Sequence, residues 1–265
     1  VWLRHNHYFP TVYFWDIIST VKSKRFWLSV FLCVFVAALN LSENMNYRGN
    51  LFGTGGIGLF LYSSLLGRNL FNYFAPIIAA MPFSSVPLDE MKNGMAKYIV
   101  AISNPIKYVV SRILSTFLLG FSVIVMGLLL NLGLSFLFAS NGAATYDQLE
   151  PSVAFRNIFY NSKALYSYIF ILNAGIFGGT YAVFSTGIFS CTKDFYLGYL
   201  YPTIIYNVST MLFGKLCGLN ILPFSTFVMS QTTIEKLLTD HATIIVTGVV
   251  LFMSSFIKWR KGARL

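Results

Sequence analysis

Six apolar stretches, each close to the length that crosses a lipid bilayer, constrain this chain more than any other feature. They are separated by polar connections and lie at residues 26–41, 69–86, 113–139, 164–189, 195–213 and 242–257. About 20 helical residues span the roughly 30 Å hydrocarbon core of a membrane. Only 11% of the residues are charged, whereas soluble domains carry about 25%. The sequence therefore predicts an all-α membrane protein with six transmembrane helices over residues 26–257.

The start of the second helix is the one boundary that the apolar pattern leaves open. Residues 51–66 are apolar but rich in glycine, and a helix that began near Ile57 would bury Arg68 at a cost of a few kcal/mol. A helix over 69–86 leaves Arg68 at the outer interface and makes 51–66 an outer re-entrant or interfacial segment. We favour this second placement, with its two prolines as kinks.

Amphipathic segments flank the predicted transmembrane helices. Residues 1–25 can place apolar side chains opposite Asp16 and Lys22, which predicts an N-terminal interfacial helix. The stretch 214–241 is too polar to span a membrane and too apolar for a free loop, so we expect an external helical segment dipped into the outer leaflet. Residues 258–265 form a basic tail.

The distribution of basic residues predicts the orientation in the membrane. Of the 19 Lys and Arg residues, 13 fall in the N-terminal segment, the connection between the second and third helices, the turn at Lys193 and the tail. The positive-inside rule therefore places both termini in the cytoplasm. Inner loops and anionic lipid headgroups explain the net charge of +10 better than a nucleic-acid partner does.

The connection between the second and third predicted helices, residues 87–112, carries the most informative pattern. Asp89 stands where an N-cap residue would, and Asn104 precedes a proline, which disfavours helical geometry at that residue. We expect a helix over 89–103, too short and too charged to cross the membrane, that lies flat on its cytoplasmic face. An interfacial helix that only anchors a loop would show the same pattern.

The two sides of this predicted helix differ in character. Helical spacing puts five apolar residues on one face: Met91, Met95, Tyr98, Ile99 and Ile102. The residues Lys92, Asn93 and Lys97 fall on the opposite face. Gly94 costs about 1 kcal/mol relative to alanine, so the helix should be bent there or pressed against another element.

The order of residues in this connection also carries a family resemblance. Glu90, Gly94 and Tyr98 follow one another at intervals of four, and then come Ser103-x-Pro105-x-Lys107-Tyr108 and Ser111-Arg112. This order resembles the cytoplasmic loop after the second transmembrane helix of ABC-2 type exporter permeases. In that family an acidic residue, Gly-Thr and Ser/Thr-x-Pro-x-Arg/Lys recur, and Met95 stands here in place of the threonine.

The resemblance implies a coupling helix that docks on a separate ABC ATPase subunit. The docking residues would be Asp89, Glu90, Met91, Lys92, Asn93, Gly94, Met95, Lys97 and Tyr98. It also implies a multi-pass protein of a bacterial cell membrane that pairs with a second copy or a sister permease. ATP and magnesium would bind to the partner ATPase and not to this chain, and the cargo would be an amphipathic or apolar peptide, lipid or drug.

Motifs for other kinds of chemistry are missing from the sequence. The run Gly53–Gly58 lacks the lysine of a phosphate-binding loop, and the three cysteines lack metal-binding spacing. All nine acidic residues fall outside the predicted membrane cores, where ion-coupled transporters normally place carboxylates. We therefore expect neither an enzyme nor an ion-coupled transporter. A six-helix channel or scaffold without an ATPase partner is the alternative.

Overall fold

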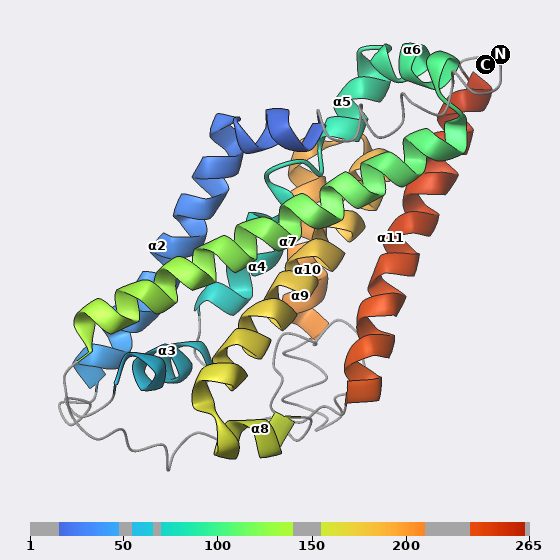
Figure 1. Cartoon of the computed structure of the whole chain (residues 1–265). Coiled ribbons are helices and arrows are strands. Elements are labelled where there is room, and N and C mark those ends of the chain that lie inside the picture. The colour runs from blue at the N-terminus through green and yellow to red at the C-terminus, as the bar shows by residue number, and fades with distance from the viewer. Residues whose placement is uncertain (1–15, 48–54, 66–69, 140–154, 210–233, 263–265) are drawn as a thin grey trace.

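The computed structural model describes residues 16–47, 55–65, 70–139, 155–209 and 234–262, and every regular element in these ranges is a helix (Figure 1). After a short helix over residues 16–21 come α2 (Lys24–Tyr47), α3 (Gly56–Leu65), α4 (Leu70–Ala80), α5 (Val86–Lys92), α6 (Met95–Ile102), α7 (Pro105–Phe138), α8 (Arg156–Asn161), α9 (Lys163–Thr192), α10 (Phe195–Ser209) and α11 (Ile234–Gly262). The predicted all-α class is confirmed.

Four of these helices are long and apolar enough to cross a membrane: α2 over Lys24–Ser42, α7, α9 and α11. The helices α4 and α10 have 11 and 15 residues, so they extend only about 16 and 22 Å. The last four residues of the fifth predicted span, 210–213, lie outside the described residues. The structure thus supports an all-α membrane protein, with four candidate spans in the part of the chain that it describes.

The second predicted span differs from the structure. The helix α4 ends at Ala80 rather than near residue 86, and turns follow over 81–85. Pro82 lacks the N–H that a continuing helix needs, and the Ser84 hydroxyl donates a hydrogen bond of 3.0 Å to the carbonyl of Ala182 in α9. The glycine-rich stretch before α4 forms α3, whose buried side chains place it among the other helices.

The flanking segments also differ from their predicted bounds. Residues 234–241 are the first turns of α11 and therefore continue the last span instead of forming part of a separate external segment. The remainder of that segment, 214–233, lies outside the described residues, as do residues 1–15 of the predicted N-terminal helix. At the other end, α11 continues to Gly262, so most of the basic tail is helical.

The helix α9 is the centre of the bundle. It packs against α7, α11, α10 and α4. Of the residues in its most apolar 18-residue stretch, 83% are buried. Glycines allow this: a Cβ on Gly120 or Gly178 would lie 3.0 Å from the carbonyl oxygen of the other, and one on Gly187 would lie 2.6 Å from that of Gly248. These contacts bring α7 and α11 close to α9 on two sides.

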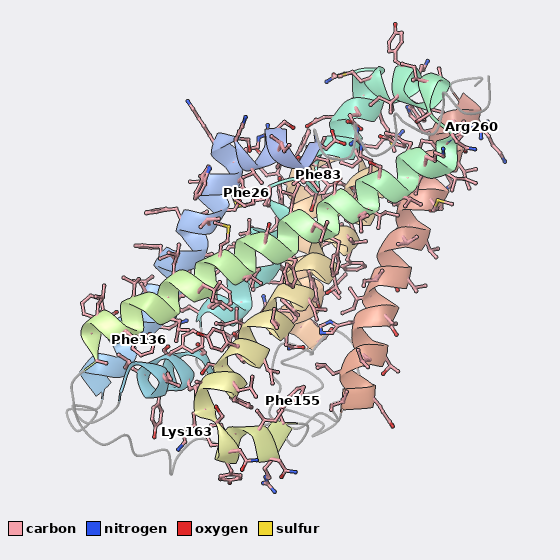
Figure 2. The ribbon with its side chains drawn as sticks, viewed as in Figure 1. Phe26, Phe83, Phe136, Phe155, Lys163 and Arg260 are labelled. Carbon is pink, nitrogen blue, oxygen red and sulfur yellow. The ribbon has the colours of Figure 1, made fainter. Side chains whose placement is uncertain are left out.

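The bundle has two distinct ends. The helices α5 and α6 lie at one end, and α3 and α8 lie at the other (Figure 1). Phe83 and Arg260 mark the first end, which we call the α6 end, while Phe136 and Lys163 mark the second, the α8 end (Figure 2). The chain therefore gathers the predicted coupling segment and the end of α11 at the same side of the bundle.

Candidate functional site

The predicted coupling helix is two short helices. The first, α5, begins after Ser85, and Pro87 lies in its first turn, where a proline fits because its missing N–H would have no helical partner. The N-cap is therefore Ser85 and not Asp89. The Asp89 carboxylate lies in the first turn of α5, where a negative charge interacts favourably with the helix dipole.

A break at Gly94 separates α5 from α6. Gly94 has φ of +76°, in the left-handed region, which ends an α-helix and which glycine adopts without steric cost. The Asn93 N–H bonds the Asp89 carbonyl at 2.9 Å, and α6 begins at Met95. The prediction of one helix over 89–103 is wrong for this reason, although α6 ends at Ile102, and Asn104 caps the start of α7.

The break also divides the predicted apolar face between two helices. Met91 in α5 is buried, whereas three other members of that face are strongly exposed in the chain: Met95 (57%), Tyr98 (75%) and Ile102 (65%). The α6 side chains that pack inward are Ala96 and Val100. We call Met95, Tyr98 and Ile102 the α6 face.

A buried ionic cluster holds α5 against α7. Arg112 of α7 is only 2% exposed, and its Nε and Nη2 donate to the two carboxylate oxygens of Glu90 at 2.8 and 2.6 Å. Such a two-pronged pair fixes orientation as well as distance. Nη1 of Arg112 donates to the Asp16 carboxylate, and the Tyr108 hydroxyl donates to Glu90 at 2.8 Å. The cluster thus joins the helix over 16–21, α5 and α7.

This cluster contains two carboxylates for one guanidinium. Burial raises the pKa of Glu90 and that of Asp16 above their ordinary values, and the positive charge of Arg112 opposes the rise. The guanidinium also lies over the rings of Tyr108 and Phe83, at 5.3 and 5.9 Å from their centroids, which adds cation–π attraction. The Glu90 side chain therefore faces into the protein, where it is bound to α7.

Lys92 forms a second tie between α5 and the bundle. Its Nζ donates to the carbonyl oxygen of Lys193 at 2.9 Å and lies 4.8 Å from the centroid of the Phe195 ring. Lys193 ends α9 in a left-handed conformation, φ 57°, and Phe195 begins α10. The helix α5 is consequently fixed to α7 on one side and to the α9–α10 turn on the other.

The nine predicted docking residues therefore divide into two groups. Glu90, Met91 and Lys92 are engaged with the bundle, and Asp89 and Gly94 are partly covered. The side chains of Asn93, Met95, Lys97 and Tyr98 are exposed, as is that of Lys92 despite its hydrogen bond to the α9–α10 turn. Sequence analysis missed Ile102 as an exposed member and Arg112 as the buried partner of Glu90. In this site α5 is fixed to the bundle, and α6 presents exposed apolar side chains.

The fold and this site define a polytopic all-α membrane protein with a short two-helix element at one end of its bundle. Comparisons with protein-family models, curated proteins and solved structures found no match to this chain. The resemblance to ABC-2 type permeases thus rests on the sequence itself: on the 87–112 connection, on the run from Asp16 to Trp27, which resembles the entry to the first helix in that family, and on the predicted order of segments.

Proposed function

We propose that this chain is the permease subunit of an ATP-driven exporter of the ABC-2 type, in a bacterial cell membrane. One observation carries the proposal: α6 exposes an apolar face at the end of the bundle, while α5, joined to it at Gly94, is ion-paired to the long helix α7. The ATPase would be a separate subunit that binds ATP and magnesium. Two permease chains would pair around the pathway.

The exposed face suits a protein partner. Three large apolar side chains occupy a helix of only eight residues, with the cation of Lys97 beside them. An amphipathic helix of this kind commonly binds by placing its apolar side chains in a groove of the partner. The aromatic ring of Tyr98 adds contact area at a small cost in side-chain entropy.

The ion-paired helix offers a route for mechanical work. A push on α6 is passed through Gly94 to α5, and from Glu90 to Arg112 of α7 through two parallel hydrogen bonds. The helix α7 has 34 residues, so it reaches about 51 Å along the bundle. Closure of the ATPase subunits would therefore move α7 relative to its neighbours and open the pathway outward.

The proposal includes six crossings with both termini in the cytoplasm. The short helices α4 and α10 pack against each other and against α9, so both belong to the bundle, and α10 keeps one side exposed at its surface. If both count as crossings with the four longer helices, the N-terminal and C-terminal ends share the side of α5 and α6. An amphipathic or apolar cargo is favoured because few ionic side chains line the spans.

Site-specific photo-crosslinking tests the docking role. A photoreactive phenylalanine analogue at Tyr98 should form an adduct with a nucleotide-binding subunit in native membranes. The matched control is Tyr160, which is 67% exposed on α8 at the opposite end of the bundle, and which should give no such adduct. A chain that yields no adduct from position 98 and purifies alone would be a channel or scaffold instead.

A further inference from the structure

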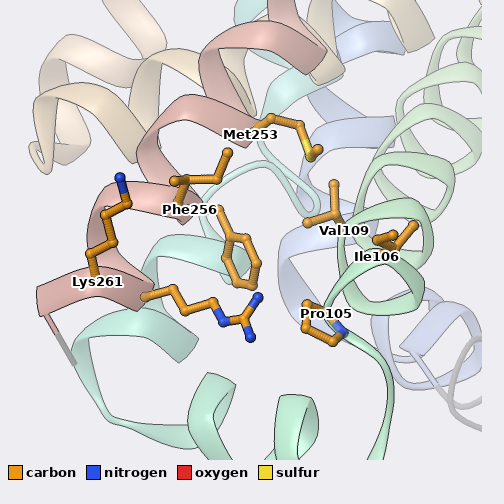
Figure 3. Close-up of a pocket in the computed structure, with 8 residues that line it drawn as sticks. Pro105, Ile106, Val109, Met253, Phe256 and Lys261 are labelled. Carbon is orange, nitrogen blue, oxygen red and sulfur yellow. The ribbon is translucent and has the colours of Figure 1, made fainter. Parts of the chain in front are cut away.

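A groove between the start of α7 and the end of α11 combines an apolar floor with a basic rim (Figure 3). Its volume is about 350 Å³, and its walls are Pro105, Ile106, Val109, Met253, Phe256, Ile257, Arg260 and Lys261. Among these described residues two are cations and none is acidic. The residues that line the groove do not include those of the α6 face or the ion-paired residues Asp16, Glu90 and Arg112.

The apolar floor is held in place by stacked aromatic rings. Phe256 projects from α11 toward Pro105 and Val109 of α7 (Figure 3). Its ring stacks on Tyr108 at 5.4 Å and on Trp259 at 5.7 Å, both between ring centroids. Because Val109 and Phe256 are buried, the floor exists before any ligand binds.

The groove opens toward the surface that faces lipid in a spanning bundle. Ile106 and Ile257 in its walls are exposed, as are Val110 of α7 and Val250 of α11, which lie on helices apolar enough to span a membrane. Trp259 lies between the spanning part of α11 and its basic end, where tryptophan commonly marks the headgroup level. An acyl chain could therefore enter from the side.

The rim is part of a wider basic region. On another side of the same turn of α11 a second hollow contains four lysines: Lys92, Lys97, Lys193 and Lys258. Each basic residue near the membrane surface favours an anionic headgroup by roughly fivefold in affinity. The basic residues of the rim thus favour a ligand with a negatively charged headgroup, and the apolar floor favours a ligand with a hydrocarbon chain.

We propose that this groove binds one anionic glycerophospholipid. An acyl chain lies against Val109, Met253 and Phe256, and the phosphate is held by Arg260 and Lys261. The bound lipid bridges α7 and α11, so it stabilises the contact between the helix that carries Arg112 and the last helix of the bundle. This site follows from the groove and its charges, and it holds whether or not the chain works with an ATPase.

Lipid binding to the delipidated full chain in neutral detergent tests the proposal. Native mass spectrometry would compare phosphatidylglycerol with phosphatidylcholine carrying the same acyl chains, and the anionic lipid should bind preferentially. Arg260→Gln with Lys261→Gln should weaken binding of phosphatidylglycerol by roughly 30-fold. The control Lys22→Gln with Lys24→Gln removes the same charge from exposed residues near the start of α2 and should leave the affinity of this site unchanged.

A second pair of variants tests the acyl chain. Ile106→Trp fills the groove and should displace the lipid, whereas Val110→Trp, on an exposed position of the same helix outside the groove, should not. Equal binding of the two lipids, or no effect of the Arg260 and Lys261 substitutions, would overturn the proposal. Competition by inorganic phosphate at the affinity of the whole lipid would also overturn it, because the apolar floor would then play no part.

Discussion

The helices α5 and α6 are neighbours of almost equal length, yet they relate to the bundle in opposite ways. In α5, Glu90 is bound to Arg112, and Lys92 is bound to the α9–α10 turn. In α6, Ala96 and Val100 are buried and Ile99 is partly buried, whereas Met95, Tyr98 and Ile102 are exposed. One connection of the chain is thus divided at Gly94 into an anchor and a contact surface. Substitutions in α5 should act on stability, and those in α6 on binding.

Loss of the anchor should have the largest effect. Arg112→Ala would leave the Asp16 and Glu90 carboxylates buried without their cation, and breaking a buried pair in this way costs about 3–5 kcal/mol. The free energy of unfolding in mixed micelles would measure the loss. Arg112→Lys keeps the charge without the two-pronged geometry and should cost less. A loss below about 1 kcal/mol for the alanine variant would show that α5 is not anchored through this cluster.

A side chain added at Gly94, between α5 and α6, should have an effect of intermediate size on stability. Gly94→Val forces a β-branched residue to a φ of +76°, at a cost of about 1–2 kcal/mol, although a Cβ would meet no atom within 4 Å. Both the unfolding free energy and ATP hydrolysis by the reconstituted complex should fall. Gly94→Asn is the control, because asparagine tolerates the left-handed region. Equal behaviour of the two variants would contradict a role for this backbone geometry.

Truncation of the contact surface should hardly change stability. Met95→Ser with Tyr98→Ser removes exposed side chains, so the unfolding free energy should stay within about 0.5 kcal/mol. Affinity for the ATPase subunit should nevertheless fall at least about tenfold, measured by binding of the purified subunits. Tyr160→Ser at the α8 end should leave binding intact. A stability loss as large as that of Arg112→Ala would erase the distinction between α5 and α6.

The pH dependence of the anchor is the smallest expected effect. Because burial raises the pKa of Asp16 and of Glu90 from ordinary values of 3.8 and 4.5, the folded state holds these protons more tightly than the unfolded chain. Stability should therefore decrease as the pH rises through the raised pKa values. Asp16→Asn should flatten the change in thermal midpoint between pH 4.5 and 7, and the exposed Glu235→Gln should not. The Asp16 side chain is 22% exposed, so solvent limits the size of the effect.

The long apolar stretches could be read from the sequence because each provides many residues of one character. The predicted span 164–189 lies within α9, and the predicted span 113–139 ends one residue beyond α7. The second span was predicted to end too late, since a proline and a serine near its end favour a turn held by α9 over a continuing helix. Composition predicts that a segment is apolar, but the hydrogen bonds at its end decide its length.

The candidate site was harder to predict because its contacts are distant in sequence. Arg112 and Asp16 are separated by 96 positions. From the charge pattern alone, Arg112 was predicted to be one of several basic residues in a cytoplasmic loop. A local signal did exist: Tyr108 and Arg112 are four residues apart and share a face of α7 with buried neighbours. For Gly94 the sequence predicted a bend or a close contact within one helix, whereas its left-handed backbone geometry ends α5 and separates it from α6.

The close contact of Gly120 with Gly178 has a mechanical consequence for α7. If α7 turns as a stiff rod about that contact, Arg112 lies about 12 Å from the pivot and Phe138 about 27 Å on the other side. A sideways displacement at the Arg112 end would be roughly doubled at the Phe138 end. The contact between Gly120 and Gly178 would then be the pivot of this rotation, and a bulky residue at either position would prevent α7 from rotating.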